Sequence, residues 1–549
     1  MSKLNEISLE NFLEFAKEAN TRSTLAVEDG LKPVHRRILY SMGEQKILSN
    51  KTHVKSAKVV GEVLGSYHPH GDSSVYDAAV RLSQDFKMRY PLVDMYGNNG
   101  SISDPDSYAA SRYTSIRLSP IGEYMLGEIN PETVDMVENY SGDLLEPVVL
   151  PSVIPNALIN GGMGIGVGVS SSLVPHNLNE VVDAILAYIA NKHITTNELM
   201  QHIQGPDFPG GGVIVDAFSL PNIYDIGKGV IKLRAKHRFE TVAGRPHIVI
   251  TEVPYLTSIE NKIIKPIQNL IREEEYQPIF EIQNSSGKHG IELRIILEKN
   301  ANPYAVLQTL FEKTGLEASI KINQTVMLKD GTFATLSLRG LILQYLKYQH
   351  NIIIKNATYH LRKSEARLHI VEGLIIAANN IDEVVQIIKK SKDISDSRKQ
   401  LINRFKLSTD QAQAILDMKL ARLNSLEINK LVNEEKSLIS KIEDLKEIIS
   451  SESRRELDIK QMLKTLKAKF GDDRRTLITE NTIAEKGERI LIYVNEENKV
   501  RSIKQDSIEQ SAFGKVGKKA ISDKPIIMID ANTKDDLWIV DTTGRLIPT

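Results

Sequence analysis

The chain has 549 residues, too many for one hydrophobic core, and at about 150 residues per domain it should form three or four domains. Its hydrophobic content of 41% and charged content of 25% are ordinary for a globular protein, and no run of 18 apolar residues predicts a membrane span. It has no cysteine and no secretory signal pattern. This excludes disulfides, thiolate catalysis and cysteine-bound zinc, and fits a cytoplasmic protein.

The first 145 residues predict an arm followed by a compact helical region. Residues 1–30 are expected to form an N-terminal arm with an amphipathic helix. Between 31 and 145, the segments 56–65 and 71–86 predict two short helices joined by a turn, with Asp72 or Ser73 as the cap of the second. Residues 31–60 hold seven lysines and arginines against one acid. Two short helices beside a basic block are typical of a helix-turn-helix, although a solvated surface would carry the same charge.

Residues 146–334 predict an α/β domain. Three runs rich in β-branched residues, 210–218, 246–255 and 290–299, are bounded by Gly and Pro and indicate strands. The segment 177–192 indicates a helix between them.

From 335 to 482 the sequence predicts long helices. A helix over about 338–377 is expected to pair antiparallel with one beginning near Leu431, whose apolar residues follow coiled-coil spacing. Between them, Ser408 and Gln411 form a capping box before an apolar face. That face consists of Ala412, Ile415, Leu416, Leu420 and Leu423. It suggests a dimer contact, with a helical hairpin inside one domain as an equal alternative. Residues 488–549 then predict four strands in one small sheet.

The pair Arg112-Tyr113 is the first candidate for chemistry. A tyrosine with a pKa of about 10 is a poor nucleophile, but an adjacent guanidinium favours the phenolate and can neutralise a phosphoryl transition state. Tyr113 is therefore suited to attack a phosphodiester. The pair alone is weak evidence, because most such pairs are surface residues.

The sequence His68-Pro-His70-Gly-Asp72 is the second candidate. Alternating His and Asp residues begin some metallohydrolase sites, although Ser73 stands where another ligand is usual. Alternatively, His70 lies at a helix N-terminus and donates to a phosphate.

The glycine-rich segment 161–172 is the third candidate, and it matches no nucleotide-binding loop. Its one exposed branched side chain, Ile165, would suit an apolar wedge that enters a base step, although a tight turn is the simpler interpretation.

Taken together, four segments closely resemble the breakage-reunion subunit of bacterial type IIA topoisomerases, which is the A subunit of DNA gyrase or of topoisomerase IV. They are residues 30–42, 55–86, 96–120 and 160–180. The resemblance implies a multidomain α+β fold: arm 1–30, winged-helix cleavage domain 31–145, tower domain 146–334, coiled coil with helical dimerisation head 335–482, and a partial C-terminal β-propeller blade 488–549.

The resemblance also implies roles for individual residues. Tyr113 would attack DNA and hold the 5′ phosphate, with Arg112 assisting, and Ile165 would intercalate. Ser73 and Asp77 would contact quinolone drugs. The remaining positions expected to bind DNA or support the active site are Arg22, Lys32, His35, Arg36, Arg37, Lys55, His68 and His70.

The partners implied are double-stranded DNA, a second copy through the C-terminal gate, and an ATPase/TOPRIM subunit in an A2B2 heterotetramer. Mg²⁺ and ATP would be held by that other subunit, and no metal by this chain. Residues 510–519 lack the basic box with which gyrases wrap DNA. We therefore expect topoisomerase IV-like relaxation and decatenation, with the A subunit of gyrase as the alternative. A metallohydrolase using His68, His70 and Asp72 and a non-catalytic architectural DNA-binding protein are further alternatives.

Overall fold

A computed structural model describes residues 3–129, 132–215, 217–272, 278–287, 290–418 and 425–479, together with five strands between 489 and 548. The chain divides into two compact units, Met1–Thr479 and Glu480–Thr549. The finer boundaries expected near residues 30, 145 and 334 stay predictions.

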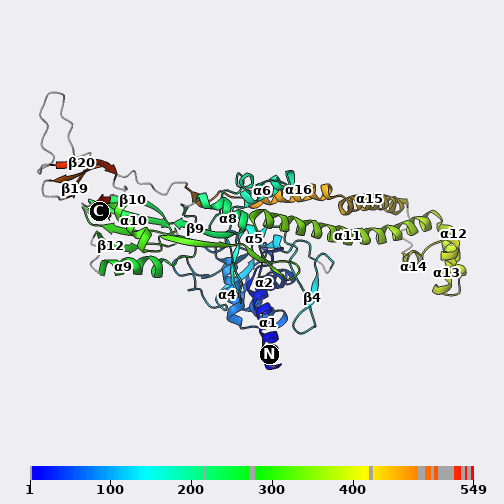
Figure 1. Cartoon of the computed structure of the whole chain (residues 1–549). Helices are drawn as coiled ribbons and strands as arrows, with labels where there is room; N and C mark the ends of the chain where they lie inside the picture. The colour runs from blue at the N-terminus through cyan, green and yellow to red at the C-terminus, as the bar shows by residue number, and fades with distance from the viewer. Residues whose placement is uncertain are drawn as a thin grey trace. The chain divides into compact units, whose positions relative to one another are not determined.

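Four helices and a small sheet form the N-terminal part of the first unit (Figure 1). The helices are α1 (Lys3–Ser23), α2 (Pro33–Glu44), α3 (Ser56–Ser66) and α4 (Asp72–Ser83). The antiparallel sheet has the order β1-β3-β2, from β1 (Val54–Lys55), β3 (Ser115–Leu118) and β2 (Val93–Tyr96). Both short helices expected from the sequence are present.

The start of α4 differs from the expected cap. Gly71 is the N-cap residue and no side chain caps the helix, so the expectation that Asp72 or Ser73 caps it is wrong. Both residues already lie within the first turn, where Asp72 still favours the positive end of the helix dipole. Ser74 Oγ instead donates to the carbonyl of Gly71 at 2.7 Å.

A six-stranded sheet carries the middle of the first unit, in the order β17-β8-β9-β14-β7-β6. Its strands are β17 (Leu477–Ile478), β8 (Val213–Ile214), β9 (Lys228–Arg234), β14 (Glu317–Asn323), β7 (Ser170–Leu173) and β6 (Gly162–Ile165). Of the expected run 210–218, only Val213–Ile214 is a strand. The surrounding helices are α5 (Asn156–Ile159), α6 (Leu178–Ala190), α7 (Thr196–Leu199) and α8 (Leu220–Ile226).

A second sheet has its own core. Its order is β10-β11-β13-β12, from β10 (Lys236–Val242), β11 (Arg245–Glu252), β13 (Leu293–Leu297) and β12 (Ile279–Asn284). The π-helical turn η3 (Glu260–Ile264) and helices α9 (Lys265–Arg272) and α10 (Pro303–Lys313) pack on it. The first unit also contains two short hairpins: β4 (Met136–Glu138) with β5 (Leu145–Pro147), and β15 (Thr325–Met327) with β16 (Phe333–Thr335).

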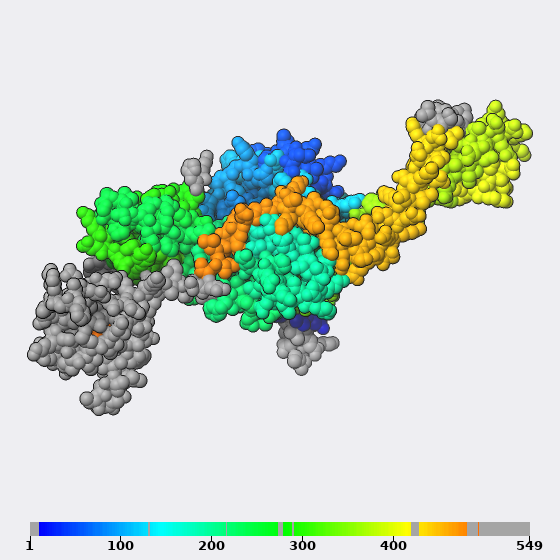
Figure 2. All heavy atoms as spheres, turned by 90° about the horizontal axis from the view of Figure 1, so that it is seen from above, coloured from blue at the N-terminus to red at the C-terminus, as the bar shows by residue number. Residues whose placement is uncertain are grey.

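The long helices α11 (Leu338–Asn379) and α15 (Ser425–Ser450) pack along each other. Arg367 contacts Glu434, whereas His350, earlier in α11, contacts Arg455 beyond the end of α15. The two helices therefore run antiparallel, as predicted. α16 (Glu452–Phe470) continues back over α6, where Figure 2 shows the orange helix across the teal region.

Between α11 and α15 in the chain, the described residues up to 418 form the helices α12 (Ile381–Lys390), α13 (Ile394–Phe405) and α14 (Thr409–Leu416). The capping box is confirmed, because Ser408 Oγ accepts from Gln411 N while the Gln411 side chain accepts from Ser408 N. Ala412 and Ile415 are buried in the core of this head. Leu420 and Leu423, which complete the expected apolar face, lie outside the described residues.

The five described strands of the second unit form two separate sheets. The first has the order β19-β18-β20, from β18 (Arg489–Asn495), β19 (Val500–Lys504) and β20 (Pro525–Asn532). The second pairs β21 (Trp538–Val540) with β22 (Leu546–Pro548). The expected single four-stranded sheet is therefore wrong, because the last segment folds back on itself as a hairpin. Residues 510–519 lie outside the described part of the chain.

A buried ionic cluster joins distant parts of the first unit. Arg89 donates to Asp207 at 2.9 Å and to both carboxylate oxygens of Asp472 at 2.7 and 2.9 Å. Arg474 makes a bidentate contact with Glu180. These contacts tie the segment after α16 to α6 and to the segments before β2 and β8. Among the described residues no helix is long and apolar enough to cross a membrane.

Candidate active site

Tyr113 stands on an exposed turn, residues 111–113, between β2 and β3. Its exposed fraction is 65%, and the guanidinium carbon of Arg112 lies 4.7 Å from the ring centroid. A cation over an aromatic face is attracted by the ring quadrupole. The phenol is therefore open to a large reactant while a positive charge stays beside it.

The turn is exposed but firmly anchored. Ser56 N donates to Thr114 O at 3.1 Å and Ala57 N donates to Ser111 O at 3.2 Å, so the turn supplies acceptors to the start of α3. The buried Thr114 hydroxyl donates to Ser56 Oγ at 2.8 Å. Lys55, expected to bind DNA, is exposed and pairs across the β1–β3 ladder with Ser115.

Three of the expected basic residues share one open concavity of about 310 Å³. Arg22 comes from the end of α1, and His68 and His70 come from the loop between α3 and α4. The other lining residues are Pro33, Val34, Gly71 and Ser74. The lining contains neither Tyr113 nor Arg112. Within one chain, the tyrosine and the concavity are thus separate parts of the surface.

His68 is held by Arg37. Arg37 Nη1 lies 2.7 Å from His68 Nδ1, and since a guanidinium can only donate, that nitrogen accepts. Burial and the charges of Arg37, His70 and Arg22 lower the pKa of His68 to about 4. Arg37 is in turn clamped by Glu146, with Nε–Oε2 at 2.7 Å and Nη2–Oε1 at 2.6 Å. At neutral pH His68 is an uncharged ring.

Arg36 has a supporting position rather than a surface one. It is buried, and its Nε and Nη2 donate to the two oxygens of Asp29 at 2.7 and 3.0 Å. Lys32 is half-buried at the N-cap of α2, and burial lowers its pKa. Burial and the charges of Lys32 and Arg36 lower the pKa of His35 to about 3. His35 is therefore neutral at physiological pH.

The two expected drug-contact residues lie on α4. Ser73 is exposed in the first turn. Asp77 is half-buried and accepts a short hydrogen bond from the Tyr108 hydroxyl, and burial together with that bond raises the pKa of Tyr108 to about 12. The two side chains therefore differ in how free they are to meet a ligand.

Ile165 ends β6 with an exposed fraction of 86%. Asn20 on α1 braces the tip of this hairpin, accepting from Val167 N at 2.7 Å and donating to Val167 O at 3.1 Å. A Cβ at Gly166 would lie 2.1 Å from Asn20 Oδ1, so a larger residue there would displace the side chain that braces the hairpin. The hairpin thus presents an apolar side chain on a rigid support.

The geometry does not favour a metal at His68, His70 and Asp72. The Nδ1 lone pair of His68 already accepts from Arg37, and the His68 and His70 rings lie tilted against each other with centroids 4.3 Å apart. In the described part of the chain, the one group of three possible metal ligands lies elsewhere.

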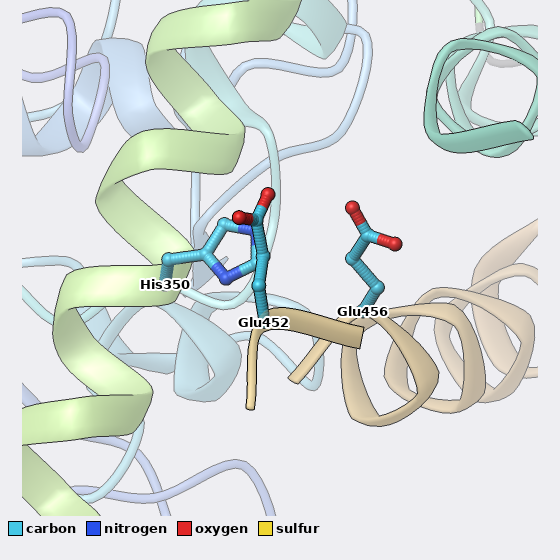
Figure 3. A group of neighbouring side chains, drawn as sticks. All are labelled: His350, Glu452 and Glu456. Carbon is cyan, nitrogen blue, oxygen red and sulfur yellow. The ribbon is translucent and has the colours of Figure 1, made fainter. Parts of the chain in front are cut away.

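That group is His350 on α11 with Glu452 and Glu456 on α16, whose ligand atoms lie within 4.8 Å of one another (Figure 3). Lys192 Nζ lies 2.6 Å from Glu452 and 3.0 Å from Glu456, and Arg455 Nε donates to His350 Nδ1 at 3.3 Å. Two cations already satisfy these ligands. We interpret the group as an ionic clamp between helices.

Comparison with known proteins places the chain in a family. The family model described as DNA gyrase/topoisomerase IV, A subunit, matches residues 22–464. The chain belongs to this family of DNA gyrase and topoisomerase IV A subunits. It is 42% identical over 484 residues to the DNA gyrase A subunit of Halalkalibacterium halodurans, covering 87% of this chain and 58% of the relative. The DNA gyrase A subunit of Streptococcus pneumoniae is 38% identical over 551 residues, covering 98% and 66%.

The relative from Thermotoga maritima, 42% identical over 466 residues, is also named as a DNA gyrase A subunit and covers 85% of this chain. The chain thus spans between 58% and 66% of the length of these relatives. All three names favour the gyrase alternative. The expected preference for a topoisomerase IV-like protein is not supported, because it rested on residues 510–519, which say little beside similarity along the rest of the chain.

Sequence reasoning missed Glu146 and Asn20. Glu146 meets Arg37 across 109 residues, and Asn20 meets Val167 across 147. No local spacing signals contacts of this kind.

Proposed function

We propose that the chain is the DNA breakage-reunion subunit of a type IIA topoisomerase of the gyrase type. The observation that carries the proposal is an exposed tyrosine under an arginine on an anchored turn, Tyr113 with Arg112. Family membership supports the same conclusion. An internal structural tyrosine would have no reason to stand 65% exposed beside a cation.

The reaction is a reversible phosphoryl transfer. The Tyr113 oxygen attacks the phosphorus of a DNA phosphodiester, the bond from phosphorus to the 3′ oxygen breaks, and the phenol proton ends on the departing 3′-hydroxyl. Arg112 offsets the charge that develops on the phosphoryl oxygens. Because a phosphotyrosine ester replaces the phosphodiester, resealing needs no ATP. One tyrosine serves each strand, so two chains act together through the helical head.

The winged-helix, tower and C-gate roles belong to this proposal, as do the DNA contacts of Arg22, Lys32, Lys55 and His70. Mg²⁺ prefers carboxylate oxygens, and the described lining of the concavity offers none. This lining is therefore a poor fit for Mg²⁺. We propose that an ATPase/TOPRIM subunit in an A2B2 assembly holds both Mg²⁺ and ATP.

Reconstitution with the ATPase/TOPRIM subunit of the same organism tests the function. We expect ATP-dependent negative supercoiling of relaxed circles, lost in Tyr113→Phe. Decatenation without supercoiling would instead support the topoisomerase IV alternative. DNA binding with no change of linking number in any assay would contradict the proposal and indicate an architectural DNA-binding protein.

A further inference from the structure

The β4–β5 hairpin holds His68 from two directions. Asn139 Nδ2 donates to Ser66 O at 2.7 Å and Tyr140 Oη donates to Gly65 O at 2.8 Å, so the hairpin tip fixes the end of α3. His68 follows two residues later. The second strand of the hairpin carries Glu146, which clamps Arg37 against the His68 ring. One hairpin therefore controls both backbone and side chain of this histidine.

The Glu146–Arg37–His68 relay is largely enclosed. The Glu146 side chain is 10% exposed and that of Arg37 is 24% exposed, while His68 is only 7% exposed. A bidentate arginine–carboxylate pair fixes the guanidinium plane. With that plane fixed, Arg37 Nη1 aims at Nδ1, so the single ring proton of neutral His68 must be on Nε2.

Nε2 is the nitrogen left for a ligand. No hydrogen bond joins it to any described residue, and His68 lines the concavity with Arg22 and His70. The charged or titratable groups facing the ring are Arg37 from α2, Arg22 from α1 and His70 from its own loop, with Glu146 behind Arg37. A neutral N–H donor among cations suits a phosphate oxygen.

We propose that Glu146 is a positioning residue, which through Arg37 fixes His68 as an Nε2–H donor to a DNA phosphate. Glu146 touches neither DNA nor the reacting atoms. The inference rests on the proposed function for its DNA ligand. The clamp itself can be measured on the free chain.

The first test is the titration of His68 by NMR in histidine-labelled chain, with His68→Gln to assign the signal. The wild type should show the Nε2–H tautomer and a pKa far below that of free histidine. In Glu146→Ala the guanidinium is released, so His68 should titrate at least one pH unit higher. Glu146→Gln keeps one acceptor for Arg37, so its His68 pKa should lie between those of the wild type and Glu146→Ala. Glu138→Gln, an exposed carboxylate on the same hairpin, should change nothing.

The second test is the pH profile of DNA cleavage with the ATPase/TOPRIM subunit. The wild type should be flat between pH 6 and 8. Glu146→Ala should cleave on the order of tenfold more slowly and gain a titration step near pH 6.5, where free histidine ionises, with partial rescue by Glu146→Gln. Thermal melting of each variant separates this change from a loss of folding.

An unchanged His68 titration in both Glu146 variants would overturn the clamp. A moved titration with unchanged cleavage by an active enzyme would overturn the positioning role. If the wild type itself never cleaves, the proposed function fails, while the NMR result still decides whether Glu146 sets the tautomer.

Discussion

The chain contains two Arg-Tyr pairs with the same stacking and opposite surroundings. Arg89 lies 4.7 Å from the ring centroid of Tyr90, and Arg112 lies 4.7 Å from that of Tyr113. Arg89 is fully buried between two aspartates, and Tyr90 donates to Asp472 at 2.8 Å. Tyr113, by contrast, is 65% exposed.

The difference teaches that the dipeptide by itself carries no chemistry. In the buried pair, burial raises the pKa of Tyr90, and its hydroxyl is used twice, since it also accepts from Leu178 N at 2.8 Å. The Tyr90 phenol therefore has a structural role, because both of its hydrogen bonds hold other parts of the chain together. In the exposed pair the same two side chains are left accessible on an anchored turn, and only that pair can meet DNA.

Exchanging the two phenols for phenylalanine gives the largest contrast. Tyr113→Phe should reduce the covalent DNA adduct to assay background without changing stability, because the hydroxyl is exposed. Tyr90→Phe should keep the adduct but lower the free energy of unfolding by about 1–3 kcal/mol, since the buried Leu178 N and the half-buried Asp472 carboxylate each lose a partner. Adduct gels and denaturant titrations measure both. A covalent DNA adduct in Tyr113→Phe would contradict the claim that Tyr113, unlike Tyr90, is the reacting residue.

Removing a partner of the buried arginine should cost stability rather than chemistry. Asp207→Ala leaves Arg89 with less compensation and should lower the free energy of unfolding by about 3–5 kcal/mol. The control is Asp106→Ala, whose exposed carboxylate pairs with Arg81 and should matter by less than about 1 kcal/mol. Equal urea midpoints for the two variants would show that the buried cluster does not stabilise the unit.

Two exposed apolar residues on β6, Ile165 and Met163, also test whether an exposed side chain acts on DNA without contributing to stability. Ile165→Ala should leave melting unchanged but reduce DNA bending and cleavage by about tenfold, within the few kcal/mol that wedge insertion involves. Met163→Ala, on the same strand with an exposed fraction of 52%, is the control and should have little effect. Fluorescence energy transfer across a labelled duplex reports the bend. Unchanged bending in Ile165→Ala would contradict the wedge.

The smallest effect concerns acid stability. Burial pushes the pKa of Asp472 up, but hydrogen bonds from Arg89 and Tyr90 and the nearby charges outweigh it and leave that pKa lowered. Stability from this group is present above the unfolded pKa of about 3.9 and is lost as pH falls through the folded value. Asp472→Asn should therefore show a shallower stability loss below pH 4 than the wild type. If Asp472→Asn and the wild type lose stability identically below pH 4, Asp472 is not a source of the acid sensitivity.

The sequence predicted features whose signals are local. Periodic apolar residues located the helix at 72–83, the helices at 56–66 and 338–379 were also expected from the sequence, and the Ser408–Gln411 spacing predicted a capping box that the structure confirms. These patterns span a few turns of chain. They depend on the 3.6-residue repeat and on backbone groups left free at helix ends.

What joins the elements was not predictable. Arg89 meets Asp472 across 383 residues, and Arg37 meets Glu146 across 109. Such pairs depend on tertiary packing, which no spacing in one sequence encodes. The sequence likewise did not predict that Arg36, one of the basic residues between 31 and 60, is buried against Asp29 and does not lie on the surface. At the C-terminus, pairing between strands decided a division into two sheets that strand propensity alone could not give.

The central claim is that the Tyr113 oxygen becomes esterified to DNA. Its most direct test is mass spectrometry of peptides from a cleavage complex denatured with the ATPase/TOPRIM subunit present. The account predicts a nucleotide attached through its 5′ phosphate to the peptide that carries Tyr113, and to no peptide that carries Tyr90. A nucleotide found on any other residue, or DNA cleaved with no covalent adduct, would contradict it.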